Sequence, residues 1–170
     1  MNNIVLFLLL FQQAPDQDSL LKSYITTEYS ISYPESWFLD ESRETSPAIL
    51  FLSPLTDTAD QFSENVNILK QNLKGREIDL AQYKQISEAQ FSKYAVNGNM
   101  LNSRIEKKGD TERYYMEYLM TLNSNDLHII SICYIKNDMA YLITFTATTK
   151  TFKLYQQTGL SMLESFKLAS

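Results

Sequence analysis

The sequence predicts an α+β fold: an α/β/α sandwich whose central, mainly antiparallel sheet of about six to seven strands carries a middle helix and a C-terminal helix. Three observations predict it. Segments with strand-like alternation fill most of the chain, two stretches have helical spacing of apolar residues, and at least one strand has large apolar residues at both parities. A strand of that last kind needs cover on both faces, which a layered arrangement provides.

Residues 29–37 form the most informative stretch, and they begin as a short alternating strand. Tyr29, Ile31 and Tyr33 share one face, while two serines share the other. Pro34 ends the pairing because it has no N–H and holds φ at about −65°. Trp37, the only tryptophan, follows the turn, and we expect it to be largely buried and to anchor the turn to the core.

The next elements alternate between apolar strands and polar connections. Residues 48–52 are a continuous apolar run, as expected of a strand buried on both faces, and residues 65–68 resume alternation. Loops are expected at residues 39–47 and 56–64. Helical spacing then marks residues 78–94.

Four further strands and a last helix complete the predicted domain. Short polar connections join the strands in pairs, which favours an antiparallel meander. These strands are residues 100–107, 112–122, 127–135 and 140–148. Apolar residues then recur at helical spacing from Phe152 to Phe166. Gly159, in the middle of this helix, costs about 1 kcal/mol relative to alanine, which indicates a close approach of its backbone to the sheet.

Composition and charge exclude several classes of function. The 170 residues fit one domain, and the net charge of −5 disfavours nucleic acid as a partner. One cysteine, Cys133, permits no intrachain disulfide, and one histidine, His128, leaves no His/Cys zinc site. No phosphate-binding glycine loop or dinucleotide fingerprint is present, so we expect no metal and no cofactor. The basic cluster is diluted by acids and is expected to be a solvated hairpin: Arg104, Lys107, Lys108 and Arg113.

The amino terminus has the hydrophobic core of a signal peptide. Residues 4–11 are an unbroken apolar run, which is shorter than the roughly 20 residues of a membrane-spanning helix. Ala14 is a small residue suited to precede a cleavage point, so residues 1–14 are expected to be a signal peptide and residues 15–28 a linker or N-terminal extension. No basic residue precedes the run, and the alternative is an apolar tail or first strand of a cytoplasmic protein.

Five tyrosines in the predicted strands are candidates for lining a ligand groove, with core and interface packing as the alternative. They are Tyr114, Tyr115, Tyr118, Tyr134 and Tyr141. Asp57, Asp60 and Glu64 offer the oxygen ligands that calcium prefers, but their spacing is not that of a calcium-binding loop and favours a solvated surface.

His128 is of the residue type that serves as a general base. However, no acid lies near it in the sequence and no nucleophile motif such as Gly-x-Ser-x-Gly is present, so we expect a structural histidine. Cys133 lies five residues on, and in a strand it faces the opposite side from His128. We therefore expect Cys133 in the core and no catalytic residue in this pair.

Taken in order, these segments resemble the PsbP-like superfamily. The resembling segments are Tyr-Ser-Ile-Ser-Tyr-Pro-Glu-Ser-Trp at 29–37, Asn-Val-Asn-Ile at 65–68, the helix at 78–94, Tyr-Tyr-Met-Glu-Tyr at 114–118, Tyr-Leu-Ile-Thr-Phe at 141–145 and Leu-Glu-Ser-Phe-Lys-Leu at 163–168. The resemblance covers residues 29–168 and is to the bacterial exported branch of a fold shared with the photosystem II protein PsbP and the Ran-binding nuclear import factor. It implies an accessory or binding role, mostly without catalysis. Neither a photosynthetic nor a Ran-binding role is implied, because the residues for those roles find no match here.

The sequence therefore leaves three functions open. The first is a non-enzymatic, exported protein, periplasmic or secreted, that binds a protein or small ligand through its sheet edge or exposed loops. It is expected to be monomeric and not to span a membrane once processed. The second is a cytoplasmic accessory factor or chaperone of the same fold, and the third is a hydrolase that uses His128.

Overall fold

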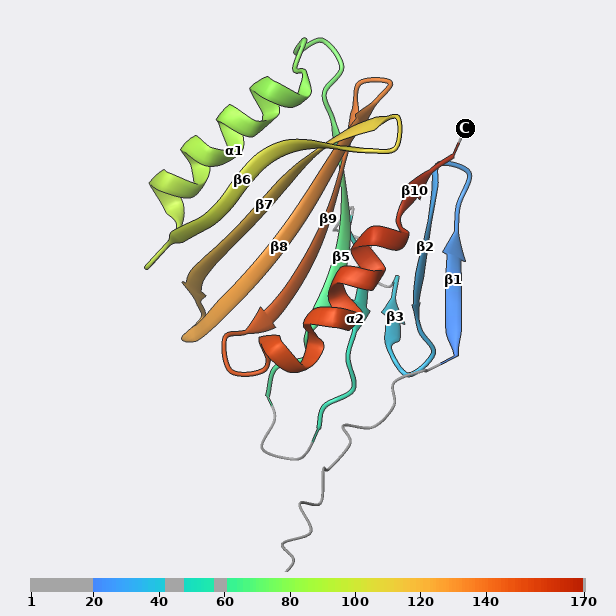
Figure 1. Ribbon diagram of the computed structural model, residues 1–170, viewed down its shortest axis with the longest axis vertical. Coiled ribbons are helices and arrows are strands. Elements are labelled where there is room, and N and C mark those ends of the chain that lie inside the picture. The colour runs from blue at the N-terminus through green and yellow to red at the C-terminus, as the bar shows by residue number, and fades with distance from the viewer. Residues whose placement is uncertain (1–19, 42–47, 57–60, 170) are drawn as a thin grey trace, which may run out of the picture.

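Two helices and two antiparallel sheets make up the part of the protein that the structure describes (Figure 1). The structure, a computed structural model, describes residues 20–41, 48–56 and 61–169. The predicted signal peptide, Asp57 and Asp60 lie outside these ranges. Among the described residues, no helix is both long enough and apolar enough to cross a membrane.

The larger sheet has seven strands in the order β3-β4-β5-β9-β8-β7-β6. Their bounds are β3 Phe38–Asp40, β4 Ala48–Leu52, β5 Asn65–Asn72, β6 Asn99–Lys108, β7 Thr111–Leu122, β8 Asn125–Lys136 and β9 Met139–Thr148. The smaller sheet has the order β1-β2-β10, with β1 Leu21–Ile25, β2 Tyr29–Pro34 and β10 Lys167–Leu168. The helices are α1 Leu80–Tyr94 and α2 Phe152–Ser165. This architecture confirms the predicted α+β fold with a middle and a C-terminal helix.

The two helices cover opposite faces of the large sheet. α1 packs on β6 and β7, whereas α2 packs on β9 and β5 and also contacts β2 of the small sheet. Figure 1 shows α2 in front of the sheet, with β1 and β2 alongside it. The main core lies between α2, the small sheet and this face, and a smaller cluster lies under α1. The layers are those of the predicted sandwich.

Strand β8 has cover on both faces, as its sequence predicts. Ile130 and Ile132 belong to the main core, while Cys133 belongs to the cluster under α1. His128 stacks on Phe152 of α2, so it faces the side opposite Cys133. The predicted meander β6-β7-β8-β9 is also present.

The tight turns of the meander account for its register. Asn123 and Ser124 between β7 and β8 have φ of 49° and 65°, and Asn137 and Asp138 between β8 and β9 have φ of 52° and 57°. Two central residues with positive φ match the right-handed twist of a hairpin. Asparagine and aspartate tolerate this conformation better than most residues, which explains their place here.

Strand β2 and the turn after it agree with the prediction from residues 29–37. Tyr29, Ile31 and Tyr33 are buried on one face, and Pro34 is the last residue of the strand. The N–H of Trp37 donates to the carbonyl of Pro34 at 2.9 Å, which closes the turn. Trp37 is 4% exposed and lies edge-on to Tyr155 of α2. The turn is thus anchored to the core, as expected.

Helix α1 begins two residues later than its spacing predicts, because Asp79 is its N-cap. The Asp79 carboxylate accepts from the N–H of Gln82 at 2.8 Å, and the Gln82 side chain accepts from the N–H of Asp79 at 2.9 Å. This capping box satisfies two backbone donors that the first helical turn leaves unpaired.

Three sequence predictions need correction. Residues 21–25, which were expected within a linker or N-terminal extension, form the strand β1, because Tyr24 packs on the core opposite Ile31. Residues 38–40 form the short strand β3 where a loop was expected from residue 39. In β4 only Phe51 is buried, because α1 contacts β6 and β7 and leaves this part of its sheet face uncovered.

Truncation of Trp37 tests the role of the anchored turn. We expect Trp37→Ala to lower the free energy of unfolding by about 3–5 kcal/mol, because it removes a large buried ring. The neighbouring Phe38→Ala is the matched control: Phe38 is 65% exposed, so its loss is expected to cost less than about 0.5 kcal/mol. Equal effects of the two substitutions in urea unfolding would contradict the anchoring role.

Candidate functional site

A cleft of about 310 Å³ opens where α2 ends and the chain turns into β10. Its walls come from the β6–β7 hairpin, from β8 and from the chain segment after α2. The lining residues are Lys108, Thr111, Tyr134, Phe166, Lys167 and Leu168. We call this the C-terminal cleft. A second cleft of about 250 Å³ lies next to the end of β10 and is lined by Thr27, Glu28, Lys136, Asn137, Met139, Tyr141 and Ala169.

A group of packed aromatic rings, which we call the aromatic floor, connects residues of the two clefts: Phe166 and Tyr134 line the first, and Tyr141 lines the second. Phe166 stacks on Tyr134, with 5.6 Å between ring centres, and on Tyr29, with 5.3 Å. Tyr141 completes the group at 6.4 Å from Phe166. Burial raises the pKa of Tyr29 to about 12, and nearby Tyr24 and Glu28 contribute. Burial also raises the pKa of Tyr141, so the hydroxyls of Tyr29 and Tyr141 are neutral at physiological pH.

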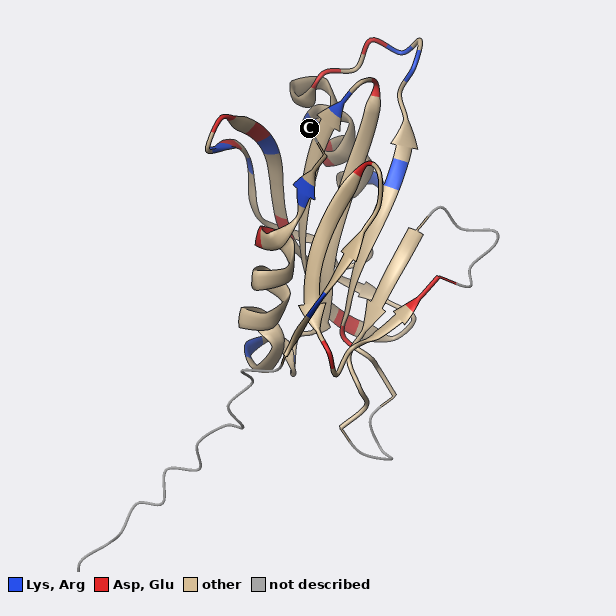
Figure 2. Ribbon diagram, turned by 90° about the vertical axis from the view of Figure 1, so that its right-hand side faces the viewer, with Lys and Arg blue, Asp and Glu red and all other residues tan. Residues whose placement is uncertain are grey.

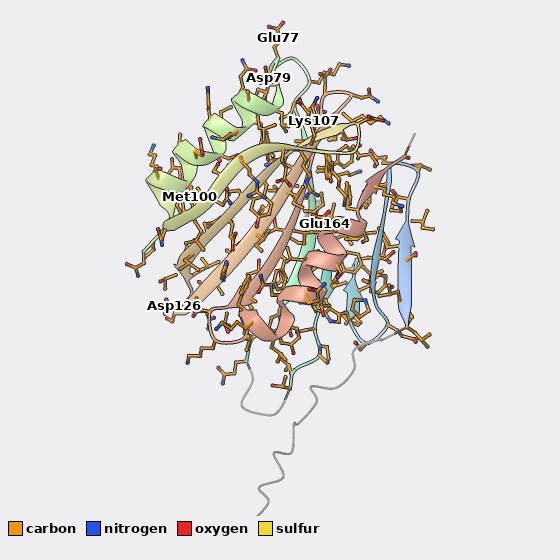
Figure 3. The ribbon with its side chains drawn as sticks, in the orientation of Figure 1. Glu77, Asp79, Met100, Lys107, Asp126 and Glu164 are labelled. Carbon is orange, nitrogen blue, oxygen red and sulfur yellow. The ribbon has the colours of Figure 1, made fainter. Side chains whose placement is uncertain are left out.

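An ion-pair network ties the end of α2 to the β6–β7 hairpin. Arg113 Nη2 lies 2.8 Å from Glu164 Oε1 and 2.6 Å from Glu106 Oε1. Lys108 Nζ pairs with Glu164 Oε2 and donates to the Glu164 carbonyl at 2.5 Å. Figure 3 shows Glu164 near the end of α2, and Figure 2 shows acidic and basic residues alternating along the β6–β7 hairpin. The sequence prediction of a merely solvated hairpin missed this link.

Arg113 is the buried centre of the network. Its side chain is 9% exposed, and its Nη1 atom has no hydrogen-bond partner among the described residues. Burial alone would lower the pKa of Arg113, but hydrogen bonds with Glu164 and Glu106 and the adjacent Tyr134 hydroxyl raise it instead. A permanent positive charge therefore lies beside the C-terminal cleft.

The five candidate tyrosines do not share one groove. Tyr115, Tyr134 and Tyr141 lie on the α2 side of the sheet, where Tyr134 and Tyr141 line the two clefts. Tyr114 belongs to the cluster under α1, and Tyr118 meets Phe91 of α1 at 5.0 Å between ring centres. Residues 114 and 118 have the opposite parity to residue 115 in β7, so a single strand places them on different faces.

Glu64 has a structural position. It is 1% exposed, and its carboxylate accepts hydrogen bonds from Ser53 Oγ at 3.2 Å and from Thr151 Oγ1 at 2.5 Å. Thr151 is the N-cap residue of α2, so Glu64 links the start of β5 to the start of this helix. Two hydroxyl donors thus occupy the carboxylate that was a candidate for calcium. Asp57 and Asp60, the other two candidates, lie outside the described residues.

His128 has the acidic partner that its sequence neighbourhood lacks. Its Nε2 atom lies 2.7 Å from Glu117 Oε1, and the Tyr115 hydroxyl donates to Glu117 Oε2 at 3.0 Å. The His128 ring also stacks on Phe152, with 3.4 Å between ring centres. Glu117 is the diagonal cross-strand neighbour of His128, since Leu119 lies directly opposite. The register of the β7–β8 hairpin would have revealed this pair.

A hydrolase would need a nucleophile beside the His128–Glu117 pair. A general base works on a nucleophile within hydrogen-bond reach. In the described part of the chain, no hydrogen bond joins His128 to a hydroxyl or thiol; its hydrogen-bond partner is Glu117. The arrangement is that of a half-buried, hydrogen-bonded pair packed on a helix.

The free edge of β1 is an apolar surface. Leu20, Leu21 and Ile25 are 77%, 70% and 74% exposed, and within the described ranges the strand pairs only with β2. Lys22, the one charged residue of β1, is 3.3 Å from Glu35. The other long free edge, β6, differs, since it has a register shift between Met100 and Asn102 and ends in two lysines. Bulges and lysines are devices that block strand addition, and β1 has neither a bulge nor an unpaired charge.

Acid sensitivity tests the ion-pair network. Burial alone would raise the pKa of Glu164, but hydrogen bonds from Arg113 and Lys108 lower it. Its contribution to stability is therefore present above the unfolded pKa of about 4.3 and is lost as pH falls through the lower folded pKa. We expect Glu164→Gln to cost about 0.5–1 kcal/mol near pH 7, since the side chain is partly exposed, and to cost less near pH 3. Urea unfolding measures this, with the exposed Glu112→Gln as control; a pH-independent cost would contradict the network.

Comparison with known proteins places the chain in a family. The family model PsbP matches residues 19–168. The cyanobacterial PsbP, CyanoP, of Synechocystis sp. PCC 6803 has a TM-score of 0.63 at 13% identity, covering 94% of this chain and 98% of its own. The Pseudomonas aeruginosa protein PA94, described as a putative regulator, has a TM-score of 0.62 at 13% identity over 85% and 94%.

A third solved structure is LpqN of Mycobacterium tuberculosis, described as involved in cell envelope biogenesis. It has a TM-score of 0.61 at 8% identity, covering 91% of this chain and 88% of its own. The search of the curated proteins finds no match. At these identities the structures share the fold, and the family model carries the assignment. Because that model spans residues 19–168, this chain belongs to the PsbP family.

Proposed function

We propose that this protein is an exported, non-enzymatic accessory protein that binds an extended segment of a partner protein along β1. The proposal is based on the free edge of β1. An edge strand presents unpaired N–H and C=O groups to which a further strand can bind, and pockets or apolar side chains at alternate positions then provide specificity.

The side chains of β1 suit a partner strand with apolar residues. Tyr24 points to the core, where its ring lies 6.1 Å from that of Phe51, so β1 is held firmly in place. Leu21 and Ile25 have the opposite parity and remain exposed on either side of Ser23. A partner that places an apolar side chain against each of them would remove both from water, which is favourable at about 25 cal/mol per Å² of buried apolar surface.

Export is supported by the apolar run at residues 4–11 and by the described roles of relatives. LpqN of Mycobacterium tuberculosis is described as involved in cell envelope biogenesis. An accessory role rather than an enzymatic one agrees with the PsbP family and with the lack, in the described part of the chain, of a nucleophile hydrogen-bonded to His128. We infer an envelope or extracellular location on these grounds.

Site-specific photo-crosslinking in the native host tests the proposal. We expect a photoreactive residue at position 25 to form adducts with one partner protein, because this position lies on the free edge. Position 105 on β6 is the matched control, since Ile105 is also exposed, at 38%, on an edge strand that is protected. Ile25→Lys should abolish the adducts formed from a probe at position 21 while changing stability by less than about 0.5 kcal/mol.

Three outcomes would contradict the proposal. Adducts from position 105 alone would place the partner on β6. Adducts between two copies of this chain, with dimers in sedimentation, would make β1 a self-association edge. Mass spectrometry of the same samples determines the first residue of the chain. Cleavage after Ala14 would support export, whereas intact Met1 in the cytoplasm would contradict it.

A further inference from the structure

We infer that the C-terminal cleft binds small organic carboxylates, held between Lys108 and Lys167 on one side and an aromatic wall on the other. This site is separate from β1 and does not depend on the partner proposed above. Its chemistry results from two properties of the cleft: the charge of its lysines and its apolar lining.

The charged residues that line the cleft are both lysines, Lys108 and Lys167. Lys108 already pairs with Glu164. Among the described residues, Lys167 forms no ion pair. The cleft therefore presents an unpaired positive charge, although the chain as a whole carries −5. An anion is the ligand that suits this site.

Arg113 adds positive charge behind the wall of the cleft and is not one of its lining residues. It lies two residues after Thr111 on β7, and continuing the pairing of Tyr114 with Cys133 sets it opposite Tyr134 on β8. Thr111 and Tyr134 both line the cleft, whereas the Nη1 atom of Arg113 is buried. A carboxylate in the cleft would therefore contact Lys108 and Lys167, and Arg113 would attract it from a greater distance.

The remaining lining favours an organic anion over an inorganic one. Phe166, Leu168 and the ring of Tyr134 present apolar surface, and the Thr111 hydroxyl offers a further polar contact. The volume of about 310 Å³ is near the lower end of ligand pockets, which suits a single-ring compound. Benzoate has the required features: one negative charge, a flat apolar body and a carboxylate.

Titration with benzoate, followed by amide chemical shifts of the full chain, tests the inference. We expect shifts to concentrate at residues 111, 134 and 166–168. Neutral benzyl alcohol, of similar size, should bind about tenfold more weakly because it cannot use the cations, and inorganic phosphate should bind weakly because it cannot use the apolar wall.

Substitution of Lys167 tests whether the lysine side of the C-terminal cleft binds the carboxylate. Lys167 is exposed, so Lys167→Gln should keep the fold, and we expect it to weaken benzoate binding about tenfold. Lys153→Gln, an exposed lysine of α2 outside the cleft, should leave binding unchanged. Three results would overturn the inference: no localised shifts with benzoate, equal binding of benzyl alcohol, or equal effects of the two lysine variants. Tighter binding of phosphate than of benzoate would overturn the choice of an organic carboxylate.

Discussion

The close contact between α2 and the sheet at Gly159 is the constraint on which the rest of the structure depends. A Cβ atom at this position would lie 2.5 Å from the Phe145 ring of β9, so only glycine lets the helix backbone come this near. The depth of α2 then sets the position of the residues at its C-terminal end. Phe166 reaches the aromatic floor, Glu164 reaches Arg113, and the chain continues into β10, which pairs with β2. We therefore expect both the C-terminal cleft and the placement of the small sheet to depend on this one packing distance.

The small sheet has a buried inner face and an exposed outer edge. Its inner face, formed by β2 and by Tyr24 of β1, is buried against α2 and the large sheet. Its outer edge is exposed and apolar at Leu21 and Ile25. The opposite edge of the protein, β6, combines a register shift with charged residues. The β6 edge thus has features that block strand addition and the β1 edge lacks them, and this asymmetry supports the proposal that β1 is the docking edge.

Local sequence pattern predicts the elements whose residues face a core. The period of two in residues 29–33, the apolar residues of β8 at both parities and the glycine in α2 each report a local packing demand, and the structure meets all three. The pattern fails where pairing is decided by distant residues. Strand β1 is mostly polar or exposed and exists because β2 lies next to it, and β10 is only two residues long. The pairing of His128 with Glu117 and the burial of Arg113 depend on strand register and on the depth of α2, so neither feature could be predicted from local sequence pattern.

Replacement of Gly159 by alanine tests this dependence most directly, with unfolding stability and amide hydrogen exchange measured together. The added methyl group must push α2 away from Phe145, so we expect the free energy of unfolding to fall by about 1–3 kcal/mol. Exchange should speed up most at Leu168 and Ala169, whose strand and hydrogen bond to Glu28 tie the end of the chain to the small sheet, and least in the β7–β8 hairpin. A variant that is instead more stable, by the roughly 1 kcal/mol that alanine gains over glycine in a helix, with exchange unchanged at β10, would show that the close contact does not position the C-terminal cleft.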